Sequence, residues 1–179
     1  MSDPFGVPAA WVRRWAHLIP AGGRVLDLAA GGGRHSRFFL GRGHGVVAVD
    51  RNVSSLADLQ GTAGVEIIET DLEDGGDWDW STPESFAGII VTSYLFRPTW
   101  PRLVRLLQPS GALIYQTYAR GHERFGRPAS AHHHLLPAEL IAGFGDSLTV
   151  VAYEHGVLHQ PDAAVQRLAA VKGIELNPL

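Results

Sequence analysis

The chain has 179 residues, of which 45% are hydrophobic and 18% charged, the balance of a folded globular protein rather than a disordered one. This length fits one domain, so we expect residues 1–179 to form a single unit. The formal net charge of −3, without a dense block of Lys or Arg, argues against a nucleic-acid partner. The absence of cysteine excludes disulfides, thiolate metal sites and cysteine nucleophiles.

No apolar stretch approaches the ~20 residues of a membrane span, and the first ten residues lack the pattern of a signal peptide. We therefore expect no membrane partner and a cytoplasmic location. The sequence does not indicate the oligomeric state.

Helix-like and strand-like segments alternate along the chain. The first is an amphipathic helix over about residues 9–19, because Trp11, Trp15 and Leu18 recur at i, i+4 and i+7. Five apolar runs predict strands at residues 24–28, 45–50, 65–71, 86–94 and 112–119. Helical patterns separate or follow them at residues 34–40, 53–61, 99–108 and 137–144, the third ended by the turn PSG. Two last apolar runs, at residues 148–156 and 165–175, predict a hairpin that closes the sheet.

This order of elements predicts an α/β fold, a Rossmann-like three-layer α/β/α sandwich. Its seven-stranded sheet is mainly parallel and carries a C-terminal antiparallel hairpin. We expect residues 1–20 to form an N-terminal helix or lid. Trp11 and Trp15 are more typical of core or lid packing than of an aromatic cage for a bound cation.

The loop Ala29–Gly33 follows the first predicted strand and leads into a helix, so its backbone N–H groups can approach a ligand closely. Its three contiguous glycines differ from the G-x-G-x-x-G spacing of dinucleotide-binding proteins. Asp27, in the strand before the loop, suits a ligand that carries an ammonium group and no phosphate, as methionine does. Asp50 ends the second strand, where a carboxylate can accept hydrogen bonds from both hydroxyls of a ribose.

These residues resemble the first motif of the class I S-adenosylmethionine-dependent methyltransferases, acid-x-Gly-x-Gly-x-Gly. The resemblance continues through RGHGVVAVD, TDLED and LLQPSGALIYQT. It implies that S-adenosylmethionine is the cofactor and that Asp71 faces the adenine amino group, with a backbone contact from Leu72. The cofactor-binding residues expected from the loop and the resemblance together are Asp27, Ala29, Gly31, Gly33, Asp50, Arg51, Asp71 and Leu72.

A narrower likeness, through SYLFRP and TYARGHERFGRP, is to the small methyltransferases grouped with tellurite-resistance proteins. One departure from the family motif is Ala29, which takes the place of its first glycine. We expect the methyl group of Ala29 to be tolerated where the backbone keeps a negative φ, and to lower cofactor affinity at most.

The segment Arg120–Leu136 is long, polar and rich in Arg and His, and such loops are often functional. We expect it to form an acceptor loop, in which guanidinium groups hold an anionic or oxygen-rich small molecule. The acceptor-binding candidates are Arg97, Tyr118, Arg120 and Arg127, with Arg124 as a further member of the arginine group. Tyr94 and Arg127 are the candidates for a catalytic role.

Three consecutive histidines, His132–His134, do not predict a metal site, because neighbours in a loop do not easily converge on one ion. One of them, or His122 or His155, is a candidate general base, although methyl transfer to a nucleophilic acceptor does not require one. Two alternatives remain open. The first is a non-catalytic module that binds the cofactor or its product. The second is an NAD(P)-dependent oxidoreductase, which the contiguous glycines argue against.

Overall fold

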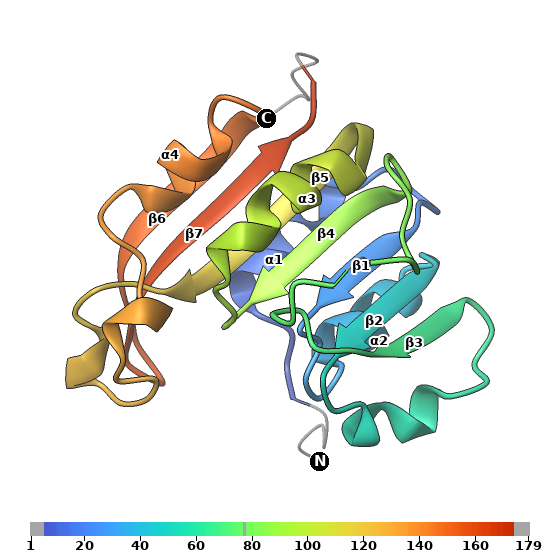
Figure 1. Ribbon diagram of the computed structural model, residues 1–179, viewed down its shortest axis with the longest axis horizontal. Coiled ribbons are helices and arrows are strands. Elements are labelled where there is room, and N and C mark those ends of the chain that lie inside the picture. Colours follow the sequence, from blue (N-terminus) through green and yellow to red (C-terminus); the bar gives the residue numbers. More distant parts are fainter. Residues whose placement is uncertain (1–5, 77, 174–179) are drawn as a thin grey trace.

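Seven strands form one mixed sheet in the computed structural model, which describes residues 6–76 and 78–173. Their order across the sheet is β3-β2-β1-β4-β5-β7-β6 (Figure 1). The first five strands are parallel, and β7 runs antiparallel to both β5 and β6. The strands are β1 Val25–Leu28, β2 Val46–Asp50, β3 Val65–Glu69, β4 Phe86–Thr92, β5 Leu107–Tyr118, β6 Thr149–Leu158 and β7 Ala163–Val171. The predicted sheet and its antiparallel hairpin are confirmed.

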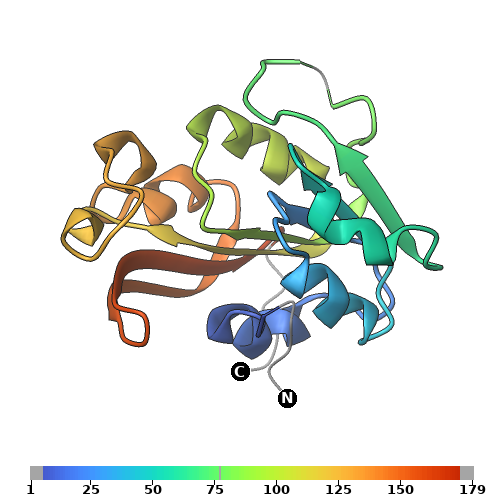
Figure 2. The same cartoon turned by 90° about the horizontal axis from the view of Figure 1, so that it is seen from below.

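Helices cover both faces of this sheet. Figure 2 shows α1 and α2 on one face and α3 and α4 on the other, which is the predicted three-layer arrangement. The α-helices are α1 Ala10–Trp15, α2 Arg34–Leu40, α3 Trp100–Leu106 and α4 Glu139–Phe144. Short 3-10 helices are η1 Ala16–Leu18, η2 Ser54–Leu59, η3 Arg97–Thr99, η4 His122–Arg124 and η5 Ala131–His133.

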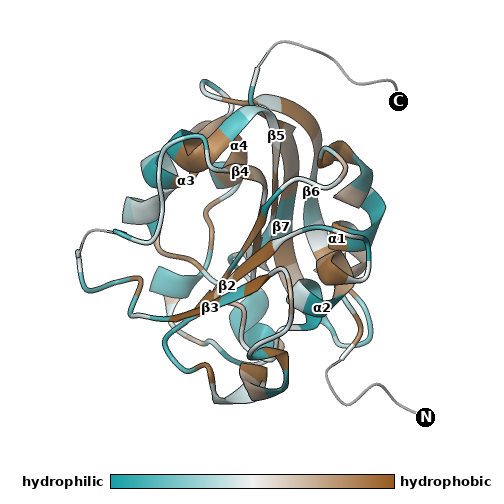
Figure 3. Cartoon of the chain, turned by 90° about the vertical axis from the view of Figure 1, so that its right-hand side faces the viewer, coloured by the Kyte–Doolittle hydropathy of each residue, from teal (hydrophilic) through white to brown (hydrophobic). Residues whose placement is uncertain are grey.

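The central strands are buried on both faces, which explains why they appear in the sequence as uninterrupted apolar runs. In β1, Leu26 and Leu28 belong to the core under α3 and α4, whereas Val25 belongs to the core under α1. All three side chains are at most 1% exposed. Figure 3 shows hydrophobic residues concentrated along the strands and hydrophilic ones on the outer parts of the helices.

The largest difference from the predicted bounds lies between α3 and β5. The helix predicted over residues 99–108 ends at Leu106, and the segment PSG belongs to β5 rather than to a separate turn. The pairing of β4 with β5 shifts register between Phe86 and Gly88, which accommodates the extra residues. Ser110 takes a left-handed φ of 61° there, and its N–H donates to the carbonyl of Lys172. The segment PSG, which favours a turn, thus forms an irregularity within β5 instead of ending the element.

The connection between β3 and β4 has no helix in its described residues. Its stacked rings, Trp78 and Trp80, have centroids 5.2 Å apart and pack against the core on the α3 side. The guanidinium of Arg102 lies over Trp78 at 4.7 Å. Two aromatic side chains therefore cover part of the sheet where a further helix would otherwise lie.

Two predicted segments extend beyond the described residues: the lid over residues 1–20, of which 1–5 lie outside, and the last apolar run, of which residues 174 and 175 lie outside. No helix among the residues described combines the length and the apolar character that a membrane crossing requires.

Candidate functional site

The glycine loop leaves the carboxyl end of β1 and enters α2 at the middle of the sheet. Gly31 and Gly33 have left-handed φ values of 53° and 72°, which glycine adopts at low cost. A Cβ on Gly33 would lie 2.4 Å from Cδ2 of Leu56, whereas one on Gly31 would meet nothing within 4 Å. Gly33 is therefore required for packing as well as conformation, while the space beside Gly31 is open to a ligand.

Ala29 corrects one expectation. Its φ is 54°, in the left-handed region, so the negative φ that would make an alanine easy to accommodate is not present. A Cβ in this region crowds the following carbonyl and costs roughly 1–2 kcal/mol. Ala29 thus carries backbone strain at the point where the chain leaves β1.

Asp50 connects the end of β2 to this loop. Its Oδ2 accepts a hydrogen bond from the Gly31 N–H at 2.8 Å, and its Oδ1 accepts one from the Asn52 N–H at 3.0 Å. A carboxylate has about four acceptor positions, so two further hydrogen bonds remain possible. The two contacts fix the orientation of the carboxylate while leaving it able to accept from a diol.

A first cavity of about 260 Å³ lies beside Asp50, at the carboxyl ends of β1 to β4. Its walls are Ala29, Asp50, Arg51, Thr70, Asp71, Leu72, Glu73 and Tyr94. Five of the eight predicted cofactor residues, and the candidate Tyr94, therefore line one cavity. Sequence reasoning missed Thr70 and Glu73, although both adjoin the predicted Asp71–Leu72 pair at the end of β3.

Tyr94 follows β4 and is partly buried at the wall of the first cavity. Its hydroxyl is buried and has no hydrogen-bond partner among the described residues. Burial raises the pKa of this phenol, and the neighbouring carboxylate of Glu73 raises it further. Tyr94 is therefore neutral at physiological pH and suits a hydrogen-bond donor, not a base.

Asp27 lies beneath the loop and lines neither this cavity nor the second one described next. It is 2% exposed, and its Oδ2 accepts a hydrogen bond from Ser36 Oγ at 2.6 Å. Burial raises the pKa of Asp27 to about 7, partly opposed by the Ser36 hydrogen bond. Nδ1 of His35 is 3.9 Å from Asp27 Oδ1, while its Nε2 accepts from the Ala9 N–H at 3.2 Å. Burial lowers the pKa of His35 to about 3, so this histidine is neutral.

A second cavity, of about 360 Å³, lies at the carboxyl end of β5 between the start of α1 and the turn from β6 to β7. Its walls are Ala9, Ala10, Arg34, Ser93, Gln116, Thr117, Tyr118, Leu158, His159, Gln160, Pro161, Ala163, Val165 and Arg167. Ser93 and Tyr94 are consecutive, so the two cavities meet the chain at neighbouring residues after β4. Of the predicted acceptor residues, Tyr118 lines the second cavity.

Comparison with known proteins shows what the chain is similar to. Residues 13–93 match the family model of the tellurite resistance protein TehB. An S-adenosylmethionine-dependent methyltransferase from Mesorhizobium loti has a TM-score of 0.71 at 14% identity, covering 92% of this chain and 98% of that one. Over residues 13–93 the chain thus matches this family, and its fold is that of the S-adenosylmethionine-dependent methyltransferases. The fold predicted from the sequence is confirmed, and the predicted family and enzyme class agree with both comparisons.

Two further solved structures resemble this chain. TehB from Haemophilus influenzae gives a TM-score of 0.72 at 17% identity and matches 94% of this chain, which spans 63% of that one. The 1,6-didemethyltoxoflavin-N1-methyltransferase from Burkholderia thailandensis was solved with bound 1,6-didemethyltoxoflavin and S-adenosylhomocysteine. It gives a TM-score of 0.67 at 20% identity, over 91% of this chain and 78% of that one. A search of curated proteins gives no match.

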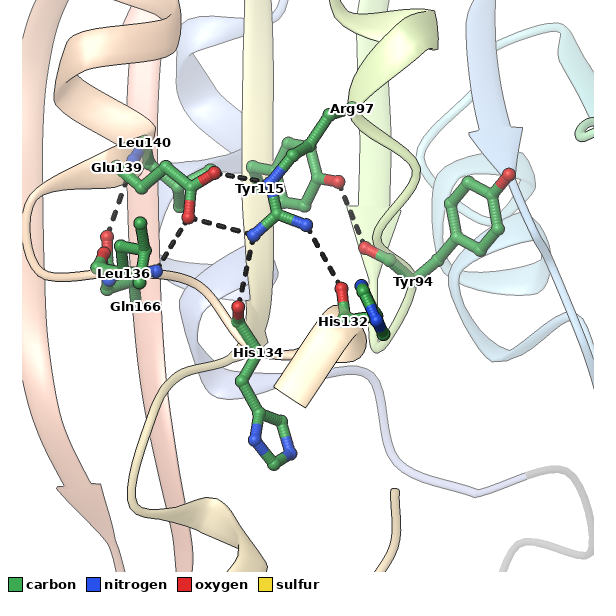
Figure 4. A network of polar contacts seen from close by, with 9 residues as sticks. All are labelled: Tyr94, Arg97, Tyr115, His132, His134, Leu136, Glu139, Leu140 and Gln166. Carbon is green, nitrogen blue, oxygen red and sulfur yellow. Dashed lines mark hydrogen bonds and ion pairs between the residues drawn. The ribbon is translucent and has the colours of Figure 1, made fainter. Parts of the chain in front are cut away.

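The side chain of Arg97 is engaged in contacts within the protein. Figure 4 shows its guanidinium between β4 and the acceptor loop. Its Nε and Nη2 donate to the carboxylate of Glu139, and Nη1 and Nη2 donate to the carbonyls of His132 and His134 at 3.0 and 3.1 Å. The Arg97 hydrogen bond lowers the pKa of Glu139, which holds the pair in its charged state. Arg97 therefore fastens the end of the acceptor loop to the segment after β4.

The acceptor loop, residues 120–136, reaches the second cavity through one aromatic contact. The ring of Tyr118 stacks on His122 with centroids 4.0 Å apart. Nε2 of His122 donates to the carbonyl of Arg127 at 3.0 Å, so the backbone at Arg127 is held behind the Tyr118 ring. The side chains of Arg120 and Arg127 are exposed and line neither cavity.

The three consecutive histidines do not share one environment. His134 is 1% exposed, and its Nε2 donates to the carbonyl of Pro128 at 2.7 Å, whereas His132 and His133 are exposed. Within the described residues, no group of three or more His, Cys, Asp or Glu side chains is placed to hold a metal ion.

Proposed function

We propose that this methyltransferase transfers the methyl group of S-adenosylmethionine to a small-molecule acceptor and releases S-adenosylhomocysteine. The observation that carries the proposal is the pair of cavities bordered by the consecutive residues Ser93 and Tyr94, one acidic and one lined by neutral and basic side chains. The family supplies a donor with a reactive sulfonium. We propose that these two cavities supply what a transfer needs, a place for the donor and a place for the acceptor.

The first cavity is proposed to hold the adenosine half of the cofactor. Asp50, fixed by Gly31 and Asn52, has acceptor positions left for the two ribose hydroxyls. Asp71 is proposed to face the adenine amino group, with a backbone contact from Leu72 and with Ala29 and Arg51 as neighbouring walls. Asp27 is proposed to act on the cofactor's ammonium through its charge at pH values above its raised pKa of about 7, from beneath the loop of Gly31 and Gly33, because its carboxylate is buried.

Bound S-adenosylmethionine would supply a methyl group on a positively charged sulfur, and this sulfur would be the leaving group in an in-line displacement. The protein's contribution is to align the acceptor with that carbon and to exclude water. Tyr94 is neutral, and its hydroxyl has no hydrogen-bond partner among the described residues, so it is proposed to donate a hydrogen bond from the wall of the first cavity. Neither Ser93 nor Tyr94 is a strong base, so we propose that the acceptor atom is nucleophilic before it binds.

The second cavity is proposed to receive the acceptor. Its volume of about 360 Å³ suits a small molecule rather than a macromolecule. The acceptor loop stands behind Tyr118, and the exposed Arg120 and Arg127 are proposed to draw in and cover an anionic or oxygen-rich acceptor. For Arg97 we propose a positioning role, because its donors are already engaged by Glu139 and the loop carbonyls.

The cofactor assignment is tested by calorimetry with S-adenosylhomocysteine. Asp50→Ala should weaken binding by roughly 1.5–3 kcal/mol, the scale of hydrogen bonds to a charged group. Asp146→Ala removes an exposed carboxylate outside both cavities and is the matched control. Equal affinity of the two variants would remove Asp50 from the site, and preferential binding of NAD would refute the cofactor.

The acceptor assignment is tested by screening small oxyanions, carboxylates and thiols with labelled S-adenosylmethionine. Arg127→Ala should leave the affinity for S-adenosylhomocysteine unchanged and raise the KM for an acceptor so identified. Full activity of this variant would exclude Arg127 from acceptor binding. If protein that binds the cofactor methylates nothing in the screen, a non-catalytic binding module is the better description.

A further inference from the structure

The acceptor loop holds a buried histidine, His134, between two oxygen atoms that come from different parts of the loop. Its side chain is 1% exposed. Nε2 donates to the carbonyl of Pro128 at 2.7 Å, and Nδ1 lies 3.3 Å from Oε2 of Glu123, in an ion-pair contact. A neutral imidazole carries one N–H and can donate to one of these oxygens, whereas the protonated ring carries two. The contacts of His134 therefore match the imidazolium form.

Glu123 presents a charged carboxylate to this ring. Its Oε2 also accepts a hydrogen bond from the Gly121 N–H at 2.9 Å. Hydrogen bonding to its own backbone N–H lowers the pKa of the Glu123 carboxyl, and the Gly121 N–H and the charge of His134 lower it further. The carboxylate is thus ionised near neutral pH, and a neutral His134 would turn the lone pair of Nδ1 toward a negative charge.

The neighbouring His122 has the opposite requirement. The rings of His122 and His134 meet edge to face, with centroids 5.8 Å apart. Nε2 of His122 donates to the carbonyl of Arg127 at 3.0 Å, and its buried Nδ1 has no hydrogen-bond partner among the described residues. A second proton on His122 would be buried without an acceptor, so the contacts of this ring match the neutral form.

The other charged side chains around His134 keep their charge near neutral pH. The guanidinium of Arg97 donates to the His134 carbonyl at 3.1 Å and is paired with Glu139, whose pKa it lowers. Arg124 adds its charge beside the carboxylate that His134 faces. Arg120 does the same beside Glu139, and a guanidinium is not deprotonated in proteins. Among these described groups, His134 is therefore the one that changes charge near neutral pH while in contact with an acid.

We propose that protonated His134 positions the acceptor loop at the second cavity by bridging Glu123 and the Pro128 carbonyl. The effect reaches the cavity through two rings, because His134 packs against His122 and His122 stacks on Tyr118, which lines the cavity. As pH rises and His134 loses a proton, Nδ1 no longer donates toward the carboxylate, and the loop is held less firmly. The inference rests on the proposed function and deepens it, because it adds a positioning residue and a pH dependence to the acceptor side.

Hydrogen exchange of backbone amides tests this bridge without an acceptor. The reporters are the N–H groups of Arg120 and Leu135, which donate to the carbonyls of Leu135 and Tyr118 at 3.0 and 2.9 Å and so close the loop. Their protection, corrected for the intrinsic exchange rate at each pH, should fall roughly 3- to 10-fold from about pH 5.5 to 8, the scale of a partly exposed ion pair. The amide of Ile114, in the buried middle of β5, reports opening of the whole fold and serves as the reference.

Three variants identify the group that titrates. His134→Gln can still donate to the Pro128 carbonyl but cannot change its charge, so the fall with pH should disappear. Glu123→Gln keeps an acceptor for the Gly121 N–H without a charge, and should also reduce the fall. His133→Gln is the same substitution at an exposed neighbour, and as the control it should retain the fall.

Protection that does not depend on pH in the unmodified protein would refute the bridge. A dependence that His134→Gln retains would also refute it, because another group would then be titrating. If His134→Gln does not fold, Glu123→Gln decides alone, and an undiminished fall in that variant would overturn the inference. Failure of the proposed function is separate, since it appears in the cofactor and acceptor assays, whereas hydrogen exchange requires neither ligand.

Discussion

The buried carboxylate of Asp27 makes the stability of the fold depend on pH in an unusual direction. Burial raises its pKa from 3.8 to about 7. The folded state therefore binds more protons than the unfolded chain between these two values, and the free energy of unfolding falls as pH rises through this window. Most native carboxylates show the opposite trend, because their pKa is lowered on folding.

The size of the effect follows from the shift. Each unit of pKa corresponds to about 1.4 kcal/mol, so a rise from 3.8 to about 7 corresponds to at most roughly 4 kcal/mol between pH 4 and pH 7. Above pH 7 the contribution is constant, because Asp27 is then ionised in both states. His35, whose pKa is lowered to about 3, gives a trend of opposite sign between pH 3 and 6.5 and masks part of the change in the unmodified protein.

Urea unfolding of the unmodified protein and of Asp27→Asn, from pH 4.5 to 8, isolates the carboxylate, because the His35 contribution cancels in the difference. The stability of the unmodified protein relative to the variant should fall steadily up to pH 7 and then level off. Ser36→Ala removes a hydrogen bond that lowers the pKa of Asp27, so it should move the end of the decline to higher pH. A difference that is flat or rises with pH would refute the reasoning.

Three further substitutions test the backbone strain in the glycine loop and the attachment of the acceptor loop by Arg97. Ala29→Gly should stabilise the fold by about 1 kcal/mol, because it releases a left-handed φ of 54°; a lower urea midpoint would contradict this. Gly33→Ala should destabilise by more than about 1 kcal/mol, since it adds both strain and a contact with Leu56, and an unchanged midpoint would count against that packing. Arg97→Ala should lower the free energy of unfolding by about 2 kcal/mol, a figure already reduced because the Arg97 side chain is 38% exposed. It should also speed proteolysis within residues 120–136. Proteolysis at the rate of the unmodified protein would show that Arg97 does not hold this loop.

The sheet and the adenosine-binding candidates could be predicted from the sequence for the same physical reason. Central strands covered on both faces are continuous apolar runs, and the carboxyl ends of neighbouring parallel strands meet at one edge. Asp50 and Asp71 each end a predicted strand or follow it directly, so locating the strands was enough to bring them together. The strain at Ala29 was not predictable, because φ depends on how the loop turns.

The second cavity could not be predicted. Its walls join the start of α2 to the turn after β6, segments separated by more than a hundred residues, and no local pattern signals that contact. The role of Arg97 could not be predicted for the same reason, since its partner Glu139 lies 42 residues further along the chain. An arginine that follows a strand suggests a substrate contact. Only the three-dimensional structure shows that the guanidinium of Arg97 is already bound by an acid of the same chain.

The position of β7 between β5 and β6 has a consequence for biosynthesis. Because β7 follows both neighbours in the chain, a ribosome exposes β5 and β6 before the strand that joins them exists. Both strands then have unpaired edges that can associate with other chains. The part of the sheet formed by β5, β7 and β6 can assemble only after β7 emerges, whereas β1 to β4 are already complete. The sheet therefore folds in two stages during synthesis, and we expect the chain to be most prone to aggregation before β7 has been synthesised.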